Sequence, residues 1–418
     1  MIAAEIRDPI HGYIYLDEVQ RDVIDTPTFQ RLRRIKQLAG AYLVYPGAHH
    51  TRFEHSIGAM YLSGLIADEL IEKGYMDPAL KEELMLSLLL HDIGHGPFSH
   101  VMEEVMAEKG VKHEDLTRRI VRETEVADVL RGYGFDEKRV ADLAVGLSKA
   151  HPNFMNEVVS GSLSADLMDY LPRDSYFAGV EYGKVDTRRI MSSLEVVNGS
   201  LALDSNSLYA FEALLLARYE MFRAVYFHRT VRAGEIMMVK AMELADDELG
   251  LTDTRDIQRY LTLTDDHVLR MLSELEPRTH ALKRARELAF NYKNRRLLKC
   301  VFEKLIQRKE GSDMELLSSK DVRAEIEREI AAKAKVDPES VFLDVPTAPS
   351  IPLSSTKETF SSLTMIFRSP LKREERIIRV EEMPLVSAIR GYLDVVRVYT
   401  TKEHRIEVEE AAGSVLGR

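Results

Sequence analysis

One spacing pattern runs through most of this chain of 418 residues. From about Thr28 to Arg308, apolar residues recur at intervals of three and four, most clearly in Ile57–Ile71, Ala79–Leu90 and Leu208–Leu249. This spacing places one face of an α-helix against a core. Strand patterns are scarce in the same region. The sequence therefore predicts a mainly α fold, built around a bundle of helices.

Patterns of another kind stand at the two ends of the chain. In 5–16, Pro9 and Gly12 punctuate β-favouring residues, which is typical of a short hairpin lying on the helical body. After the polar stretch Arg308–Asp313, short alternating segments predict a small α+β module. The strands expected there are Ser340–Val345, Ser362–Phe367, Arg376–Val380 and Val396–Thr400, and the helices are Asp321–Lys335 and Pro384–Val395.

These patterns predict three parts. Residues 1–50 would form the N-terminal hairpin and first helix, packed on the body, and residues 51–308 the helical catalytic domain with a helical extension. Residues 309–418 would form the C-terminal α+β module. A length of 418 residues is compatible with this division.

Composition excludes several classes of protein. Cys300 is the only cysteine, so an intramolecular disulfide is impossible and a metal must be held by histidine and carboxylate. The formal charge of −11 makes nucleic acid an unlikely main partner, because non-specific binding to nucleic acid depends on Lys and Arg. The sequence shows neither a 20-residue apolar span nor a secretory leader, so we expect a cytoplasmic protein without a membrane partner.

The strongest candidate for chemistry is the His91-Asp92 pair, which follows an apolar helix and precedes Gly94 and Pro97. An imidazole nitrogen and a carboxylate oxygen suit a divalent cation. Histidine is also concentrated around this point. Seven of the 13 histidines lie between residues 49 and 113, and these are His49, His50, His55, His91, His95, His100 and His113.

Further ligands must come from other helices. His55 stands in Arg52–Ser56, just before the helix expected to begin near Ile57, and could point into the bundle. Asp166, Asp169 and Tyr170 share one face of a short helix expected to end at Pro172, so spacing alone does not say which aspartate is a ligand. A site of two histidines and two aspartates suits manganese, iron, nickel, zinc or magnesium.

His55, His91-Asp92 and Asp166 match the H…HD…D signature of the HD-domain metal-dependent phosphohydrolases, and longer strings are similar to the deoxynucleoside triphosphate triphosphohydrolases of that superfamily. These strings are Asp8–Gly12, Asp25–Pro27, Phe29–Arg33, Ile35–Leu38, Arg52–Ser56, Gly94–His100 and Ile389–Tyr399. The resemblance covers nearly the whole chain. It implies an HD-type helical bundle whose metal ligands are His55, His91, Asp92 and Asp166.

The resemblance also implies a reaction, in which a deoxynucleoside triphosphate is cleaved at its α-phosphorus to give the deoxynucleoside and triphosphate. His113 would donate a proton near the scissile bond, and Glu103 would orient its ring. His95 and His100 would contact the α-phosphate, and Arg52 would stabilise negative charge.

Sugar selection is implied in the same way. Gln37 and Asp174 match residues that hydrogen-bond the 3′-hydroxyl. Leu38 and Tyr170 match residues packed where a 2′-hydroxyl would sit, which would disfavour ribonucleotides.

The family's activation by a guanine nucleotide, dGTP or GTP, in a homo-oligomer (dimer or tetramer) is implied less completely. Asp25, Gln30 and Arg33 match guanine-reading residues, whereas Ala4 and Thr401 stand where lysines are expected.

The substrate side also departs from the family pattern. Leu167 replaces a phosphate-binding lysine, and Val225 falls where an arginine is expected, although Arg223 or Arg229 could substitute for it.

Two other functions remain open. An HD hydrolase of another phosphate ester, such as a nucleoside monophosphate, a cyclic nucleotide or a signalling polyphosphate, would use the same metal ligands. A non-catalytic nucleotide-sensing scaffold would keep the fold without turnover. A zinc peptidase is disfavoured, because Asp92 replaces the essential Glu of H-E-x-x-H and Gly94 and Pro97 break its helix.

Overall fold

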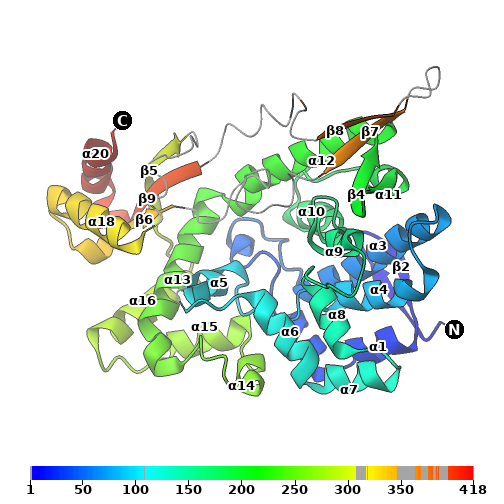
Figure 1. Ribbon diagram of the computed structural model, residues 1–418. Helices are drawn as coiled ribbons and strands as arrows, with labels where there is room; N and C mark the ends of the chain where they lie inside the picture. The colour runs from blue at the N-terminus through cyan, green and yellow to red at the C-terminus, as the bar shows by residue number, and fades with distance from the viewer. Residues whose placement is uncertain are drawn as a thin grey trace.

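The computed structural model describes residues 2–107, 109–306, 317, 319–345, 363–368, 375–379, 383, 385 and 394–417. Figure 1 shows a large helical body with one small sheet at its upper right and another, flanked by two helices, at its upper left. The N-terminus lies beside the body and the C-terminus at the far end of the second sheet. The mainly α fold predicted from the sequence is confirmed.

Helices account for most of the body. They are α1 (Glu18–Ile24), α2 (Pro27–Gln30), α3 (Arg52–Glu72), α4 (Lys81–Leu90), α5 (His100–Ala107), α6 (His113–Glu123), α7 (Glu125–Gly132), α8 (Glu137–Ala144), α9 (Asn153–Ser160), α10 (Ala165–Ala178), α11 (Thr187–Ser192), α12 (Leu208–Met221), α13 (Arg229–Leu249), α14 (Ile257–Leu261), α15 (Asp265–Ser273) and α16 (His280–Lys293). Helices α18 (Lys320–Ala334) and α20 (Arg405–Leu416) belong to the C-terminal part.

Helix α3 is the centre of the body. Its side chains enter two apolar clusters, with Ile57 and Met60 in one and Leu62 and Ile66 in the other. It begins at Arg52, earlier than the sequence predicted, because Thr51 and Glu54 form a capping box that satisfies the first backbone N–H groups. His55 therefore lies inside the first turns of the helix.

The strands form three sheets. Strands β1 (Ala4–Asp8) and β2 (Gly12–Leu16) make the expected N-terminal hairpin. Strands β3 (Leu194–Val197), β4 (Ser200–Asp204), β7 (Thr364–Arg368) and β8 (Glu375–Arg379) make a four-stranded sheet in that order, with β4 and β7 parallel. Strands β5 (Lys299–Ile306), β9 (Asp394–Thr400) and β6 (Val341–Asp344) make an antiparallel sheet in the order β5-β9-β6.

Four strands expected in the C-terminal part and the helix α18 are confirmed, with ends shifted by one or two residues. The prediction of few strands before Arg308 missed β3, β4 and β5. These strands are short or pair with distant segments, so local periodicity does not reveal them. Of the helix expected over Pro384–Val395, most residues lie outside the described ones, and Asp394 and Val395 belong to β9.

Two helices differ from their predicted extent. The segment Leu208–Leu249 is broken by a π-helical turn at Phe222–Tyr226, where the ring of Phe222 packs on those of Tyr226 and Phe227. Helix α10 does not end at Pro172 but continues to Ala178, and Gly179, with a φ of 70°, closes it. Pro172 removes one backbone hydrogen bond from the helix. The packing of the buried residues on both sides of Pro172 compensates for this loss.

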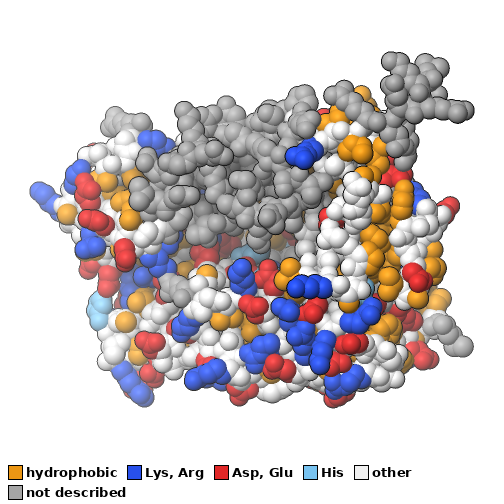
Figure 2. Space-filling model, in the orientation of Figure 1, with side chains coloured by type: hydrophobic (Ala, Val, Ile, Leu, Met, Phe, Trp, Pro, Cys, Tyr) orange, Lys and Arg blue, Asp and Glu red, His pale blue; other side chains and the backbone are white. Residues whose placement is uncertain are grey.

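The visible surface of the body carries charges of both signs, interspersed along the lower half of the face in Figure 2. None of the described helices combines the length and apolar character needed to cross a lipid bilayer.

Candidate metal centre and catalytic site

Two imidazoles from different helices meet at the centre of the body. His55 lies in the first turns of α3, and His91 follows the last residue of α4. Their Nε2 atoms lie 3.2 Å apart, and both side chains are buried. Helices α3 and α4 pack along each other, which is what brings these residues together.

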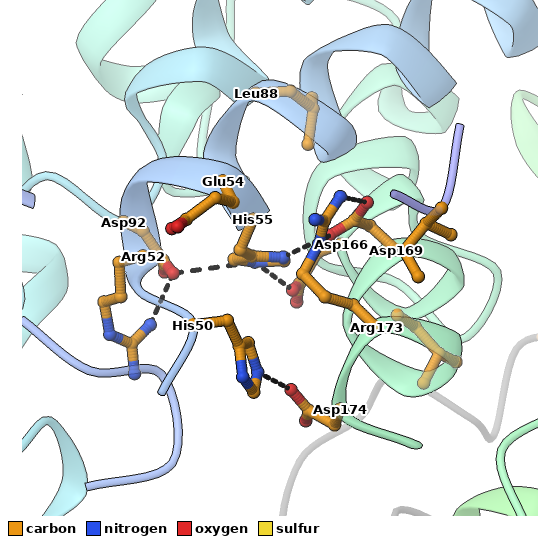
Figure 3. A network of polar contacts seen from close by, with 12 residues as sticks. His50, Arg52, Glu54, His55, Leu88, Asp92, Asp166, Asp169, Arg173 and Asp174 are labelled. Carbon is orange, nitrogen blue, oxygen red and sulfur yellow. Dashed lines mark hydrogen bonds and ion pairs between the residues drawn. The ribbon is translucent and has the colours of Figure 1, made fainter. Parts of the chain in front are cut away.

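Two carboxylates converge on the same point (Figure 3). Asp92 places its oxygens 3.5 Å from Nε2 of His55 and 3.4 Å from Nε2 of His91. Asp166, in the first turn of α10, places Oδ1 3.1 Å and 3.7 Å from the same two nitrogens. His55, His91 and Asp92 form a group whose ligand atoms could hold one metal ion, and Asp166 contacts both imidazoles of that group.

The other nitrogen of each imidazole is held by a different partner. Nδ1 of His91 donates to the backbone carbonyl of Leu88 at 2.6 Å. Nδ1 of His55 lies 2.8 Å from Oδ2 of Asp169. With Nδ1 engaged in each ring, the two Nε2 atoms are left to face each other, as expected for a metal-binding pair. Asp166 and Asp169 therefore act on opposite nitrogens of the same histidine.

Asp169 is fully buried and belongs to a network that reaches the N-terminal hairpin. Arg173, one turn later on α10, donates to both of its oxygens at 2.8 Å. His11 contacts Oδ1 at 2.6 Å. Arg173 also donates to Asp8 at 2.8 Å, so the turn between β1 and β2 is tied to the residue that orients His55.

The charges in this centre suit a cation. Burial lowers the pKa of His55, but hydrogen bonds to Asp166 and Asp169 and the charge of Asp92 outweigh it and raise the pKa to about 10. Burial alone would raise the pKa of Asp92, yet the charges of Arg52, His91 and His95 hold it well below its usual range. The carboxylates thus stay ionised, and their negative charge favours a cation beside the two imidazoles, so the donor set fits a divalent metal ion.

Arg52 is fixed beside Asp92 rather than free. One guanidinium nitrogen pairs with Oδ2 of Asp92, and Nε donates to Oγ of Ser99 at 2.8 Å. Ser99 and its neighbour Phe98 have positive φ values of 49° and 56°, which non-glycine residues adopt at a cost. Asp265 accepts a hydrogen bond from the backbone of Phe98 at 2.8 Å and helps to hold this turn.

A second group lies next to the first and contains the expected proton donor. The ring of His113, at the start of α6, stacks on that of His95 with centroids 4.0 Å apart. Nδ1 of His113 pairs with Glu103, and Nδ1 of His100 lies 2.8 Å from the other oxygen of the same carboxylate. The structure thus brings together all four of these predicted residues, although the side chain of His100 is 76 % exposed.

His95 joins the two groups. Its Nε2 lies 3.2 Å from Oδ1 of Asp92 while its ring stacks on His113. Burial, with the positive charges of Arg52 and His113, lowers the pKa of His95 to about 3. His95 is therefore neutral at physiological pH. His95, Glu103 and His113 form a second group with the spacing of possible metal ligands.

The residues expected to select the sugar lie around α10. Oδ1 of Asp174 is 2.7 Å from Nε2 of His50, and Oδ2 accepts from the hydroxyl of Tyr226 at 2.7 Å. Tyr170 packs between the rings of His55 and Tyr226, at 6.4 Å and 6.5 Å between centroids.

The other two sugar-side residues precede α3. Oε1 of Gln37 is buried and has no hydrogen-bond partner among the described residues. Leu38 is half-buried and packs against two apolar clusters.

The two substrate-side positions that depart from the family pattern, Leu167 and Val225, lie in the core. Leu167 is 2 % exposed and Val225 fully buried, both in the same apolar cluster. Arg223 lies over the ring of Tyr219. Sequence reasoning missed another cation on this side of the site, Arg218. Burial raises the pKa of Tyr170 to about 12, and the positive charge of Arg218 acts in the opposite direction. The buried Nε of Arg218 has no hydrogen-bond partner among the described residues.

The residues expected to read a guanine base lie at the surface. Gln30 donates to the backbone carbonyl of Ile24 at 2.8 Å, and its Oε1 accepts from Nε of Arg33 at 2.8 Å. The guanidinium of Arg33 lies over the ring of Phe53, and Asp25 caps the end of α1. The structure thus brings Gln30 and Arg33 together, outside the histidine and aspartate groups.

Sequence reasoning missed several residues that hold the ligands and the sugar side. They are Asp8, His11, His50, Arg173 and Tyr226. Two signals for these residues were available in the sequence. His11 belongs to a string that carries the family resemblance, and His50 belongs to the cluster of histidines. No local pattern indicates that residue 11 meets residue 169 or that residue 50 meets residue 174.

Comparisons with known proteins agree with this geometry. Residues 52–174 match the family model described as HD domain, and residues 185–417 match the HD associated region. The uncharacterized protein YwfO of Bacillus subtilis is 38 % identical over 245 residues, covering 57 % of this chain and 55 % of that protein.

Two further relatives extend the match. Human deoxynucleoside triphosphate triphosphohydrolase SAMHD1 is 31 % identical over 352 residues, covering 71 % of this chain and 55 % of that protein. The chain thus spans about half the length of these curated relatives. The crystal structure of a hypothetical protein from Aquifex aeolicus is similar with a TM-score of 0.77 at 29 % identity, covering 98 % of this chain and 100 % of that one.

Proposed function

Since the chain belongs to the HD-superfamily deoxynucleoside triphosphate triphosphohydrolase family, we propose that it hydrolyses deoxynucleoside triphosphates at the α-phosphorus, releasing the deoxynucleoside and intact triphosphate. The HD domain supports the coarser statement that it is a metal-dependent phosphohydrolase. The finer activity rests on the residues around the metal centre.

One observation carries the proposal. The Nε2 atoms of His55 and His91 face each other at 3.2 Å between the carboxylates of Asp92 and Asp166, and Asp174 lies two turns further along the helix that carries Asp166. A phosphate at the metal centre and a sugar at Asp174 would therefore be bound by the same helix, as a nucleotide requires.

The proposed metal ligands are His55, His91, Asp92 and Asp166. When bound, a divalent cation (manganese, iron, nickel, zinc or magnesium) supplies charge that polarises an α-phosphoryl oxygen and lowers the pKa of water. Asp92, whose other partner is Arg52, stays ionised in this role. Arg52 in turn is oriented by Ser99 and adds a fixed positive charge next to the phosphate.

His113 is the proposed proton donor to the departing 5′-oxygen. Glu103 engages its Nδ1, which leaves Nε2 to carry the proton. Burial alone would raise the pKa of Glu103, but the charge of His100 and hydrogen bonds from His100 and His113 hold it well below its usual range. His95, which is neutral, and His100 are proposed to contact the α-phosphate.

Gln37 and Asp174 are the proposed partners of the 3′-hydroxyl, and Leu38 and Tyr170 the residues packed against the 2′ position. The unpartnered Oε1 of Gln37 supports this role, because a buried acceptor without a donor costs free energy that a hydroxyl would recover. Asp174 is an acceptor with capacity beyond the donors that already contact it.

Regulation is a separate proposal. A guanine nucleotide, dGTP or GTP, would bind at Asp25, Gln30 and Arg33 and promote a homo-oligomer (dimer or tetramer). The pairing of Gln30 with Arg33 on the surface supports it. Native mass measurement with and without dGTP tests it: a larger mass and a faster rate are expected, and an unchanged mass and rate would overturn it.

Product analysis tests the proposed reaction. The four dNTPs and four NTPs are incubated with the metal-loaded protein, with and without dGTP, and the products are separated by ion-exchange chromatography. Intact triphosphate from dNTPs alone is the expected result. Release of mono- or diphosphate would instead support the hydrolase of another phosphate ester, and no turnover of any nucleotide would support the non-catalytic scaffold.

The substitution Asp166→Ala tests the ligand set. Removal of one of four ligands should lower the bound metal and reduce turnover by at least about 100-fold, because the remaining donors leave the cation underbound. Metal content is measured by mass spectrometry of the dialysed protein, and folding by circular dichroism. Full activity in the folded variant would contradict the mechanism.

A further inference from the structure

We propose that His50 is a positioning residue that holds the two groups selecting the sugar, Gln37 and Asp174, in register with each other. The inference deepens the proposed function and rests on it. His50 contacts both partners through different atoms: its backbone carbonyl accepts from the N–H of Gln37 at 3.1 Å, and its Nε2 lies 2.7 Å from Oδ1 of Asp174. Figure 3 shows the imidazole directed at Asp174.

The ring of His50 is itself held in place. Its side chain is fully buried, and it stacks on the ring of Phe177 with centroids 4.6 Å apart and planes 12° apart. Phe177 follows Asp174 by three residues, so one face of α10 supplies both the carboxylate and the stacking partner. His50 has little freedom to turn away from Asp174.

The loop before His50 lies close against α10. A Cβ added at Gly47 would come within 2.5 Å of the backbone carbonyl of Phe177, so only glycine fits there. Tyr45 donates to the backbone carbonyl of Ala224, which ties the same loop to the π-helical turn. The loop is thus packed between α10 and the turn that carries Tyr226.

Tyr226 completes the support of Asp174. Its hydroxyl donates to Oδ2 at 2.7 Å, while His50 engages Oδ1. Burial, followed by the charge of Asp174, raises the pKa of Tyr226 well above its usual value, so the hydroxyl remains a donor. Each oxygen of the carboxylate is fixed by one donor and keeps a lone pair for a substrate hydroxyl.

Gln37 supplies the second contact. Its Oε1 is buried and has no hydrogen-bond partner among the described residues. A sugar hydroxyl has one hydrogen to donate and two lone pairs. Two side chains joined through His50, one of them an unused acceptor, form a rigid recognition site for such a hydroxyl. Loss of the His50 imidazole would free the carboxylate of Asp174 to turn, while the backbone carbonyl of residue 50 would still hold Gln37.

The test compares a substrate that has a 3′-hydroxyl with one that lacks it. The metal-loaded full chain is assayed with dATP and with 2′,3′-dideoxy-ATP, and kcat and KM are measured separately. His50→Phe keeps a ring on Phe177 and removes the donor to Asp174. His50→Gln keeps a donor at the position of Nε2 and should rescue. His49→Phe is the matched control, because His49 is adjacent and exposed.

For His50→Phe, kcat/KM for dATP should fall by about 10- to 100-fold, the range for loss of one hydrogen bond to a charged group. The value for dideoxy-ATP should change by less than about threefold, with metal content unchanged. His50→Gln and His49→Phe should both stay near the wild-type ratio. Equal losses on the two substrates would overturn the inference, since they would mean that His50 is merely structural.

Tyr226→Phe keeps the test decisive if His50→Phe does not fold. Removing this one hydroxyl should lower the preference for dATP over dideoxy-ATP, and an unchanged preference would overturn the inference. If the wild type hydrolyses dATP but shows no preference for the 3′-hydroxyl, the inference alone fails. If the wild type hydrolyses neither compound and binds both equally in calorimetry, the proposed function and the inference both fail.

Discussion

His55 carries a partner on each ring nitrogen, with Asp169 at Nδ1 and Asp166 at Nε2. At the scale of the residue, this arrangement answers a question that the sequence left open. Both aspartates lie on one face of α10, so helical periodicity predicts that both reach the site. Only the direction of approach distinguishes the carboxylate facing His91 from the one that fixes the ring.

Asp169→Asn tests the orienting role. Loss of the negative charge behind His55 should weaken metal binding by roughly 10- to 100-fold, the effect typical of residues behind a ligand. Affinity is measured by calorimetry with manganese or zinc. Asp68→Asn is the control, because Asp68 pairs with Lys81 on the exposed side of α3.

Asp169→Asn removes the buried charged partner of Arg173 and could therefore prevent folding. His11→Gln is the second variant for that case. It alters only the outer contact of the network, so a smaller loss in the same direction is expected. Wild-type affinity in both folded variants would contradict the orienting role.

The raised pKa of His55 predicts how metal binding depends on pH. With a pKa of 6.5 when unfolded and about 10 in the metal-free fold, protonated His55 contributes stability that is fully present below pH 6.5 and is lost as the pH rises through about 10. A metal must displace this proton, so its affinity should weaken as the pH falls below about 10.

Calorimetry in buffers of different ionisation enthalpy counts the protons. At about pH 7.5, at least about one proton should be released for each metal ion bound. Metal binding without any proton release, and with an affinity independent of pH, would contradict the prediction.

At the scale of the element, the site depends on how closely α3 and α10 approach. A Cβ at Gly58 of α3 would overlap the carboxylate of Asp169 and the guanidinium of Arg173. The network that orients His55 thus occupies the space that a side chain at residue 58 would need. The sequence predicts both helices but contains no signal for this contact, because it forms between segments more than 100 residues apart.

Gly58→Ala should therefore destabilise the protein although alanine favours helices. The preference of about 1 kcal/mol for Ala over Gly is outweighed by displaced buried charges, and we expect a net loss of about 1–3 kcal/mol in the free energy of unfolding, as for overpacked cores. Metal affinity should fall with it. Urea denaturation and calorimetry measure the two effects.

Gly64→Ala is the matched control on the same helix. A Cβ there would lie 3.0 Å from the side-chain end of Met85, which can move aside. A change below about 1 kcal/mol is expected. Equal effects of the two substitutions would show that the network at Gly58 has no special importance.

At the scale of the whole molecule, Arg232 joins three parts of the chain. From α13 it donates to both oxygens of Asp344 at the end of β6, at 2.8 Å and 3.2 Å, and to Glu104 of α5 at 2.8 Å. Glu104 follows Glu103, the carboxylate that holds His113. The C-terminal sheet is thus tied through one buried cation to the helix that carries part of the site.

Arg232→Met should cost about 3–5 kcal/mol in the free energy of unfolding, because it leaves Asp344 buried without its cation. Urea denaturation of the full chain measures the loss. Arg255→Met is the control: Arg255 is 90 % exposed and pairs with Asp253 at the surface, so a much smaller loss is expected. Equal losses in the two variants would contradict the role of Arg232.

The strand pairings of the molecule show where sequence reasoning stops. Four C-terminal strands were predicted because alternation of side chains is a local property. The partners of these strands were not predicted: β7 pairs with β4 and β9 with β5, across 162 residues between Ala202 and Thr364 and 94 residues between Glu303 and Arg397. The predicted domain boundary at residue 308 stays a prediction. Both strand pairings join a strand before this boundary to one after it.

By itself, the sequence determined the helical class, the hairpin and the set of side chains able to bind a metal, because periodicity and residue chemistry are carried by short segments. The tertiary structure decided which atoms of those side chains meet. It placed Asp166 against Nε2 of His55, Asp169 against Nδ1 and His50 against Asp174. Such choices depend on the packing of α3, α4 and α10, and contacts between distant segments leave no periodic trace in the chain.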